Sequence, residues 1–180
     1  ACKTYVKALL YHRPWYGLVG YPVGRMLDAK LNLSNKSGFG LKRISRGNYR
    51  LLCDRLDRMY EPIMQQRANA LYFLEHLNPK GIILPREKSF AMSNYYQFAV
   101  LCSDRKHRDS LADELCRKGI DCAKYLSDIA QVAAAEYGYK GDCPRAEECA
   151  NRVLVIPHHY ALSQRALDQI IERVNAAGNC

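Results

Sequence analysis

Residues 97–102 read Gln-Phe-Ala-Val-Leu-Cys, a run of strand-forming side chains bounded by polar residues. Ser103 or Asp104 can cap a helix that follows, and Gly119 suits the left-handed position at its end. The apolar side chains within residues 120–126 then predict a second strand. A strand, a helix and a strand joined by short links indicate a compact α/β unit.

Helical periodicity dominates the sequence before this unit. Between residues 46 and 77, apolar side chains recur every three, four or seven positions, which predicts one long amphipathic helix. Pro62 removes a backbone donor inside it, so we expect a kink or a break near Glu61. After the helix, residues 82–85 form a short extended run.

The sequence after the unit predicts a short helix over residues 143–150 and a third strand over 153–156, stopped by Pro157. Ser163 can cap a final amphipathic helix. At the other end of the chain, glycine, proline and asparagine recur through residues 1–45. We interpret residues 1–45 as an irregular connecting arm, in which only Tyr5 to Tyr11 could form a helical turn or two.

The chain has 180 residues, of which 48% are hydrophobic, enough for a core without covalent staples. Its 27 Lys and Arg against 18 Asp and Glu give a net charge of +9, which favours polyanions. A nucleic-acid site would need aromatic side chains interleaved with the basic ones, and none is evident. The basic face can instead match an acidic partner domain or an anionic substrate.

Of the eight cysteines, Cys102, Cys116 and Cys122 lie in or beside apolar runs, where a thiol acts as a small hydrophobic group, so we predict reduced thiols in a cytoplasmic protein. No Cys-x-x-Cys pair occurs, and we predict no metal site. No apolar run approaches the ~20 residues of a membrane span, and no targeting signal is visible. Residue 1 is not Met, which we interpret as a processed end, an engineered boundary or a domain cut.

Catalytic motifs are scarce. The run from Ser37 to Gly40 is not followed by a strand-to-helix phosphate fingerprint, so it predicts a turn. His158 and His159 are adjacent and cannot share one helical face as a metal pair would, which favours a structural or rim position. No Gly-x-Ser-x-Gly or His-Glu-x-x-His sequence occurs, and we assign no catalytic residue to this chain.

Several motifs nevertheless occur in an ordered series. Pro144-Arg-Ala-Glu147, followed by Leu154-Val-Ile-Pro157-His-His159, resembles the closing motif of the DegT/StrS family of pyridoxal-phosphate sugar aminotransferases. Arg43-Ile-Ser45 resembles the Arg-Met-Ser of that family, at the right distance from an Arg67-x-x-Ala70 that resembles the end of its long helix. Residues 94–98, 108–111 and 119–120 also resemble segments of this family, so the resemblance extends over about residues 40–178.

This resemblance implies an α/β (α+β) small domain over residues 46–180. It would have a long first helix and a small, mostly antiparallel sheet of about three to four strands covered by helices, as in the C-terminal domain of fold-type I enzymes. The parent protein would carry pyridoxal phosphate on a lysine of an N-terminal domain, whose signature is missing here. The chain alone would then be inactive and bind no cofactor.

The resemblance also implies the parent's activity and site. A cytoplasmic homodimer would transfer an amino group from an amino acid, glutamate, to a nucleotide-linked keto sugar. Arg43 becomes the candidate cofactor-binding residue, able to pair with an anion or a nearby carboxylate, and Tyr125 the candidate substrate-binding residue. Two positions depart from the family pattern: Leu41 stands where an Asn is usual, and Leu126 follows Tyr125 where a Pro is common.

One alternative stays open at this stage. The 180 residues could be a stand-alone basic module that binds a polyanion or a partner protein, without any part in transamination. Salt-sensitive binding of nucleotide or nucleic acid by the chain would favour this hypothesis.

Overall fold

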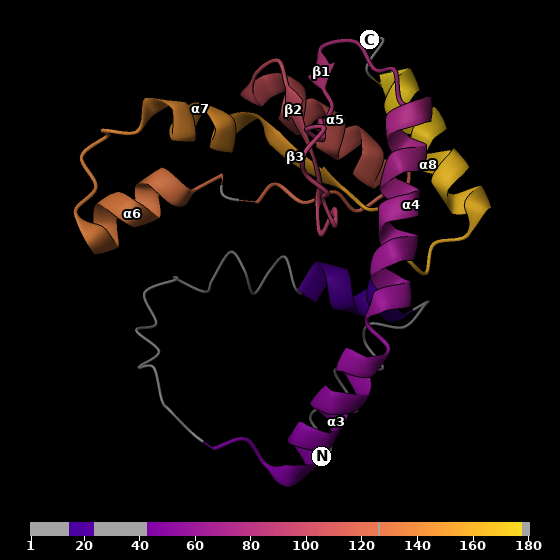
Figure 1. The fold of residues 1–180 in the computed structure, drawn as a ribbon. Coiled ribbons are helices and arrows are strands. Elements are labelled where there is room, and N and C mark those ends of the chain that lie inside the picture. Colours follow the sequence, from indigo (N-terminus) through magenta and orange to yellow (C-terminus); the bar gives the residue numbers. More distant parts are fainter. Residues whose placement is uncertain (1–14, 24–42, 126, 178–180) are drawn as a thin grey trace. The chain divides into compact units, whose positions relative to one another are not determined.

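The computed structural model describes residues 15–23, 43–125 and 127–177 (Figure 1). The chain divides into two compact units, Ala1–Leu41 and Lys42–Cys180. In the first unit residues 15–23 are helical and include the π-helix η1, Tyr16–Gly20. We predicted an irregular arm there because of its glycines. A glycine lowers helix propensity by only about 1 kcal/mol, so it does not prevent a helix from forming. The predicted turn at residues 5–11 lies outside the described residues.

An antiparallel sheet of three strands forms the centre of the second unit, in the order β1-β2-β3 (Figure 1). The strands are β1, Ile82–Ile83; β2, Phe98–Cys102; and β3, Val153–Ile156. Phe98 pairs with Ile156 and Val100 with Leu154, and all four side chains are buried. Alternate residues of a strand face the same side of a sheet, so this register places all four on the core face.

The long amphipathic segment forms two helices, α3 (Arg46–Asp57) and α4 (Tyr60–His76). The break falls at Arg58 and Met59, close to the position predicted from Pro62. Pro62 is the third residue of α4, where a backbone N–H has no partner inside the helix and its loss costs little. The Ser45 side chain caps α3 by accepting a hydrogen bond from the Asn48 N–H at 3.2 Å.

Local capping signals also set the ends of α5 (Arg105–Arg117) and α8 (Gln164–Ala177). Of the two candidate caps for α5, Asp104 is the one used, and its carboxylate accepts from the His107 N–H at 2.8 Å. Gly119 has a φ of +81°, as predicted. The Ser163 hydroxyl accepts from the Ala166 N–H at 3.3 Å and caps α8.

The predicted second strand is wrong. The described residues 120–125 contribute only a single bridge, in which Ala123 and Val155 exchange two backbone hydrogen bonds of 2.9 and 3.0 Å. The segment places the Ile120 side chain in the core and leaves Tyr125 half exposed, so it crosses the edge of the sheet and does not run along it. Two helices follow: α6, Ile129–Tyr137, which was not predicted, and α7, Pro144–Arg152.

The core lies between the sheet and three helices, α4, α5 and α8. Figure 1 shows α4 and α8 side by side, and α8 also packs on α5. Phe73 of α4 meets Phe98 of β2 edge to face, with ring centroids 5.3 Å apart. No residue of α3 or α6 is buried, so these two helices take no part in the core.

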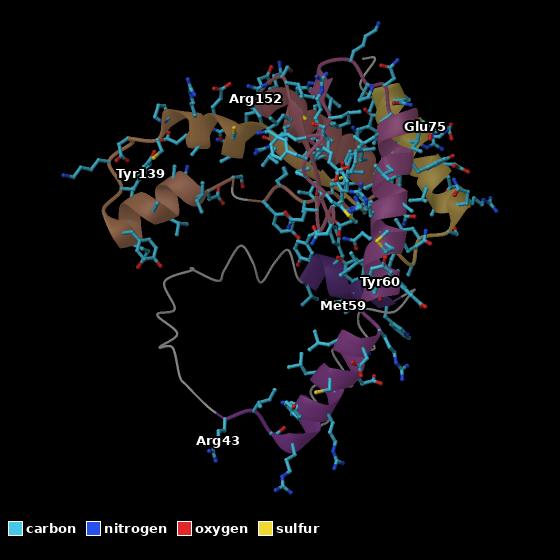
Figure 2. The ribbon with its side chains drawn as sticks, in the orientation of Figure 1. Arg43, Met59, Tyr60, Glu75, Tyr139 and Arg152 are labelled. Carbon is cyan, nitrogen blue, oxygen red and sulfur yellow. The ribbon has the colours of Figure 1, made fainter. Side chains whose placement is uncertain are left out.

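Part of the basic charge is internal. Arg108 is 2% exposed, and its guanidinium donates to the Ala150 carbonyl oxygen at 3.1 Å and to the Asp109 carboxylate at 2.8 and 3.0 Å. Arg152, which Figure 2 labels near the end of α7, donates to the Cys102 carbonyl oxygen at 2.8 Å. These arginines join α7 to α5 and β2. No helix of the described ranges is long and apolar enough to cross a membrane.

Candidate functional site

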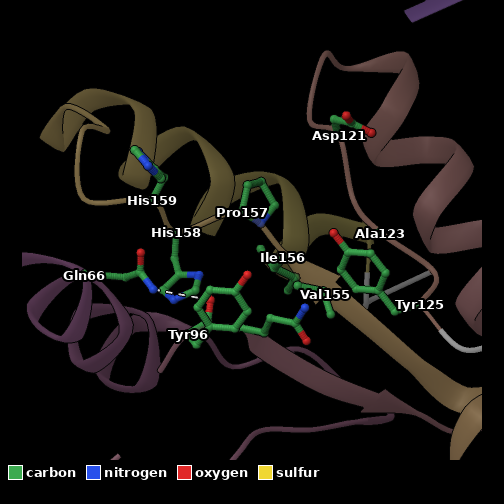
Figure 3. Close-up of a pocket in the computed structure, with 11 residues that line it drawn as sticks. Gln66, Tyr96, Asp121, Ala123, Tyr125, Val155, Ile156, Pro157, His158 and His159 are labelled. Atoms are coloured by element: carbon green, nitrogen blue, oxygen red, sulfur yellow. Dashed lines mark hydrogen bonds between the residues drawn. The ribbon is translucent and has the colours of Figure 1, made fainter. Parts of the chain in front are cut away.

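A pocket of about 290 Å³ opens beside the end of β3 (Figure 3). Four segments far apart in the sequence line it: α4, the turn before β2, the segment that crosses the sheet edge, and the end of β3 with the residues that follow it. Their polar lining side chains are Gln66, Tyr96, Gln97, Asp121, Tyr125, His158 and His159. The floor is apolar, formed by residues 155–157 and Ala123.

The turn before β2 has an unusual backbone. Tyr95 has a φ of +46°, the left-handed region that residues other than glycine seldom adopt, at a cost of about 1–3 kcal/mol. Two side chains hold the Tyr95 carbonyl oxygen: the Gln66 amide donates to it at 2.9 Å, and His158 Nε2 lies 2.5 Å away. Gln66 also donates to the Tyr96 carbonyl oxygen at 3.3 Å, as the dashed line in Figure 3 shows.

The turn sends its two tyrosines in opposite directions. The Tyr95 side chain is buried against Phe98 with ring centroids 6.4 Å apart, whereas Tyr96 is 78% exposed and lines the pocket. Among the described residues, the buried Tyr95 hydroxyl has no hydrogen-bond partner. Burial raises the pKa of this hydroxyl, and the nearby Glu87 carboxylate adds to the effect.

His158 is a structural residue, as predicted. Its ring is buried near Phe98, and burial lowers its pKa, so the imidazole is neutral at physiological pH and can donate from Nε2 to the Tyr95 carbonyl. Asn69 of α4 is also buried, and its amide donates to the carbonyl oxygens of His158 and His159 at 3.3 and 3.0 Å. The residues after β3 are therefore tied to α4.

An ion pair fixes the other end of the turn. The Arg67 guanidinium donates to both oxygens of Glu87, at 2.7 and 2.8 Å, and to the Ser93 carbonyl oxygen at 2.6 Å. The Ser93 N–H donates to the Glu87 carboxylate in turn. The hydrogen bonds from Arg67 and from the Ser93 backbone lower the pKa of Glu87 to about 2.

The structure separates the two predicted site residues. Tyr125 lines the pocket and is 51% exposed. Arg43 does not line it: Arg43 is exposed, and Figure 2 shows it just before α3 with its side chain pointing away from the ribbon. Leu41 lies outside the described residues.

Sequence reasoning missed Gln66, Tyr96 and Asp121. Gln66 is 29 residues from the carbonyl that it holds, a contact that no local pattern reveals. Asn94-Tyr-Tyr96 did carry a signal, because Asn94 and Ser93 are residues that favour turns, and both cap N–H groups here, at 3.0 and 3.1 Å.

The donor set limits the chemistry of the pocket. Its described lining includes neither a lysine, which could form a Schiff base, nor an arginine, which could pair with a phosphate. The described residues also contain no group of three His, Cys, Asp or Glu side chains that could hold a metal ion. Aromatic rings, amides and a carboxylate remain, which suit binding and orientation of a polar ligand.

A small antiparallel sheet with covering helices is shared with a known class of enzymes. A model of the DegT/DnrJ/EryC1/StrS aminotransferase family matches residues 30–175. The chain belongs to this family. No curated protein sequence gives a significant match.

Solved structures of aminotransferases share the fold. The chain is 28% identical to the aminotransferase TlmJ from Streptoalloteichus hindustanus, over 69% of this chain and 34% of TlmJ, with a TM-score of 0.63. It is 25% identical to DesV of S. venezuelae, solved in complex with a ketimine intermediate, over 72% of this chain and 35% of DesV, with a TM-score of 0.64. The aminotransferase from Psychrobacter cryohalolentis is similar in fold, with 18% identity over 78% of this chain and 40% of that one, and a TM-score of 0.62. The chain thus spans about a third of the length of TlmJ and DesV.

Proposed function

We propose that this chain is the C-terminal small domain of a pyridoxal-phosphate-dependent sugar aminotransferase. The parent would move an amino group from glutamate to the keto group of a nucleotide-linked sugar, as a homodimer. The observation that carries the proposal is the family match over residues 30–175, combined with coverage of about a third of related enzymes.

The cofactor would be bound by a part of the parent that this chain does not include. Pyridoxal phosphate needs a lysine for its aldehyde and positive charge near its phosphate, and the described lining of the pocket has no Lys and no Arg. The pocket residues therefore do not fit the cofactor. Arg43, exposed before α3, stays a candidate for contact with a cofactor that another domain or subunit holds.

The role left to this chain is to form one wall of the substrate cleft. Tyr125 and the turn at Tyr96 provide aromatic surface. The hydrogen bonds from Gln66 and His158 keep the turn in a fixed position, and those from Asn69 fix the residues after β3. A fixed wall lowers the entropy cost of orienting a substrate.

The coding sequence immediately upstream of Ala1 tests the proposal. We expect it to encode a large α/β domain with a cofactor lysine, and the full-length product to convert glutamate to 2-oxoglutarate when a nucleotide-linked keto sugar is present. Replacing that lysine with alanine should abolish the aldimine absorbance and the reaction together. An upstream sequence without such a domain would refute the proposal.

The stand-alone binding module predicts a different result. The chain would then bind nucleic acid or heparin with an affinity that falls steeply as salt rises. We expect only weak salt-dependent binding of such polyanions, because Arg67, Arg108 and Arg152 already form hydrogen bonds within the domain.

A further inference from the structure

We propose that Tyr96 binds the hexose ring of the substrate, opposite Tyr125, and that the left-handed turn at Tyr95 exists to present it. The inference rests on the proposed function, since it names the part of the nucleotide-linked sugar that this pocket holds. It assigns Tyr96 as a binding residue and Gln66 as its positioning residue.

The first argument is the strain at Tyr95. A left-handed tyrosine is costly, and such residues persist where the surrounding structure holds them in place. Here Gln66 and His158 both bind the carbonyl of this residue, and its own N–H donates to the Ser93 hydroxyl at 3.1 Å. As a result, the Tyr95 side chain is buried in the core and the Tyr96 side chain lines the pocket.

The second argument is the exposure of Tyr96. Its side chain is 78% exposed although its neighbours Tyr95 and Phe98 are 4% and 0% exposed. The Tyr96 and Tyr125 rings both line the pocket and come from different segments, with the end of β3 between them (Figure 3). Two exposed aromatic rings at one concave site provide a binding surface of the kind that ligands bury.

The charge of the pocket lining favours the sugar ring of the substrate over its diphosphate. The described lining lacks Lys and Arg, and it includes the carboxylate of Asp121, which would repel a diphosphate. An uncharged ring with hydroxyl groups fits better, because its C–H face can lie on a tyrosine ring. Its hydroxyls can bond to the Asp121 carboxylate and to the amide of Gln97.

The test is a nuclear magnetic resonance titration of the 180-residue chain with three probes: UDP-glucose, methyl glucoside and uridine. We expect UDP-glucose and methyl glucoside to shift the amide signals of Tyr96, Ala123 and Tyr125, and uridine to leave them unchanged. Shifts with uridine but not with methyl glucoside would overturn the assignment to the hexose. The absence of shifts with all three probes would overturn the binding site.

Variants test the two named residues. Tyr96→Ala should weaken binding of UDP-glucose by roughly tenfold, as expected for loss of one aromatic contact, whereas Tyr96→Phe should keep it. Tyr137→Ala is the matched control, because Tyr137 is 84% exposed and does not line the pocket. Equal binding by Tyr96→Ala and Tyr137→Ala would refute the role of Tyr96.

Gln66→Glu keeps the size of the side chain but removes its donors. If Gln66 positions Tyr96, this variant should lose the ligand-induced shift at Tyr96 while the shift at Tyr125 persists. Loss of both shifts or of neither would contradict a positioning role. These measurements report binding and need no transamination, so they are independent of the test of the proposed function. If the upstream sequence encodes no cofactor domain but the chain binds the hexose, the proposed function is refuted and the hexose site is retained.

Discussion

Replacing the buried Arg108 with methionine tests which of its contacts stabilises the domain. Methionine fills much of the same volume but cannot donate a hydrogen bond, so Arg108→Met leaves the buried Ala150 carbonyl without its partner. A buried polar group that loses its hydrogen bond costs about 1–3 kcal/mol. We therefore expect the free energy of unfolding to fall by about that amount.

The ion pair with Asp109 should contribute less. The Asp109 side chain is 36% exposed, so water screens its carboxylate, and in Asp109→Asn the amide oxygen can still accept a hydrogen bond from the buried Arg108. Asp109→Asn should consequently cost less than 1 kcal/mol. The double variant Arg108→Met with Asp109→Asn should cost about the same as Arg108→Met alone.

Urea unfolding followed by circular dichroism measures these differences. Arg105→Met is the matched control, since Arg105 lies 3.8 Å from the same carboxylate but its side chain is 59% exposed, and it should cost about 0.5 kcal/mol or less. If Asp109→Asn cost as much as Arg108→Met, the ion pair and not the hydrogen bond to the Ala150 carbonyl would contribute most of the stability, contrary to this prediction.

Three further predictions concern acid stability, core packing and thiol reactivity. Glu87 has its pKa lowered from 4.5 to about 2, so its stabilising effect is present above pH 4.5 and is lost as the pH falls towards 2; Glu87→Gln should show a smaller loss in acid unfolding over that window. Leu154→Ala, at a fully buried position of β3, should lower the free energy of unfolding by about 2–5 kcal/mol in urea, and a cost below 1 kcal/mol would contradict the core described here. Burial raises the pKa of the Cys122 thiol to about 12, so iodoacetamide at neutral pH should alkylate the exposed Cys149 first, as mass spectrometry of the native protein would show; equal rates would contradict the burial of Cys122.

The parts of the fold that the sequence predicted correctly depend on local signals. A run of strand-forming residues predicted β2, Ser163 predicted the start of α8, and Gly119 predicted the end of α5. Each of these signals acts within a few residues, through backbone conformation or a capping hydrogen bond.

The incorrect predictions involve tertiary contacts. Residues 120–126 have the composition of a strand, yet among the described residues 120–125 only Ala123 bonds to the sheet, because the segment leads from the core at Ile120 to the exposed Tyr125. Helix α6 was missed because its alanines favour a helix without forming an apolar stripe, and none of its residues is buried.

The lining of the pocket was predictable only in part. Tyr125 was predicted from a family motif and lines the pocket, and its role in substrate binding stays a prediction. Tyr96 depends on the backbone of Tyr95, which is held by Gln66 and His158 from distant parts of the chain. Pattern reading along the sequence does not detect a turn that is stabilised from such a distance.

The short strand β1 has a consequence for self-association. Among the described residues it pairs only with β2, and an unpaired strand edge can recruit a strand from another molecule. Here the edge is two residues long and Pro85, which has no N–H to donate, follows it closely. Although Ile83 on this edge is 57% exposed, two residues offer too few backbone hydrogen bonds to start a continuous intermolecular sheet from β1.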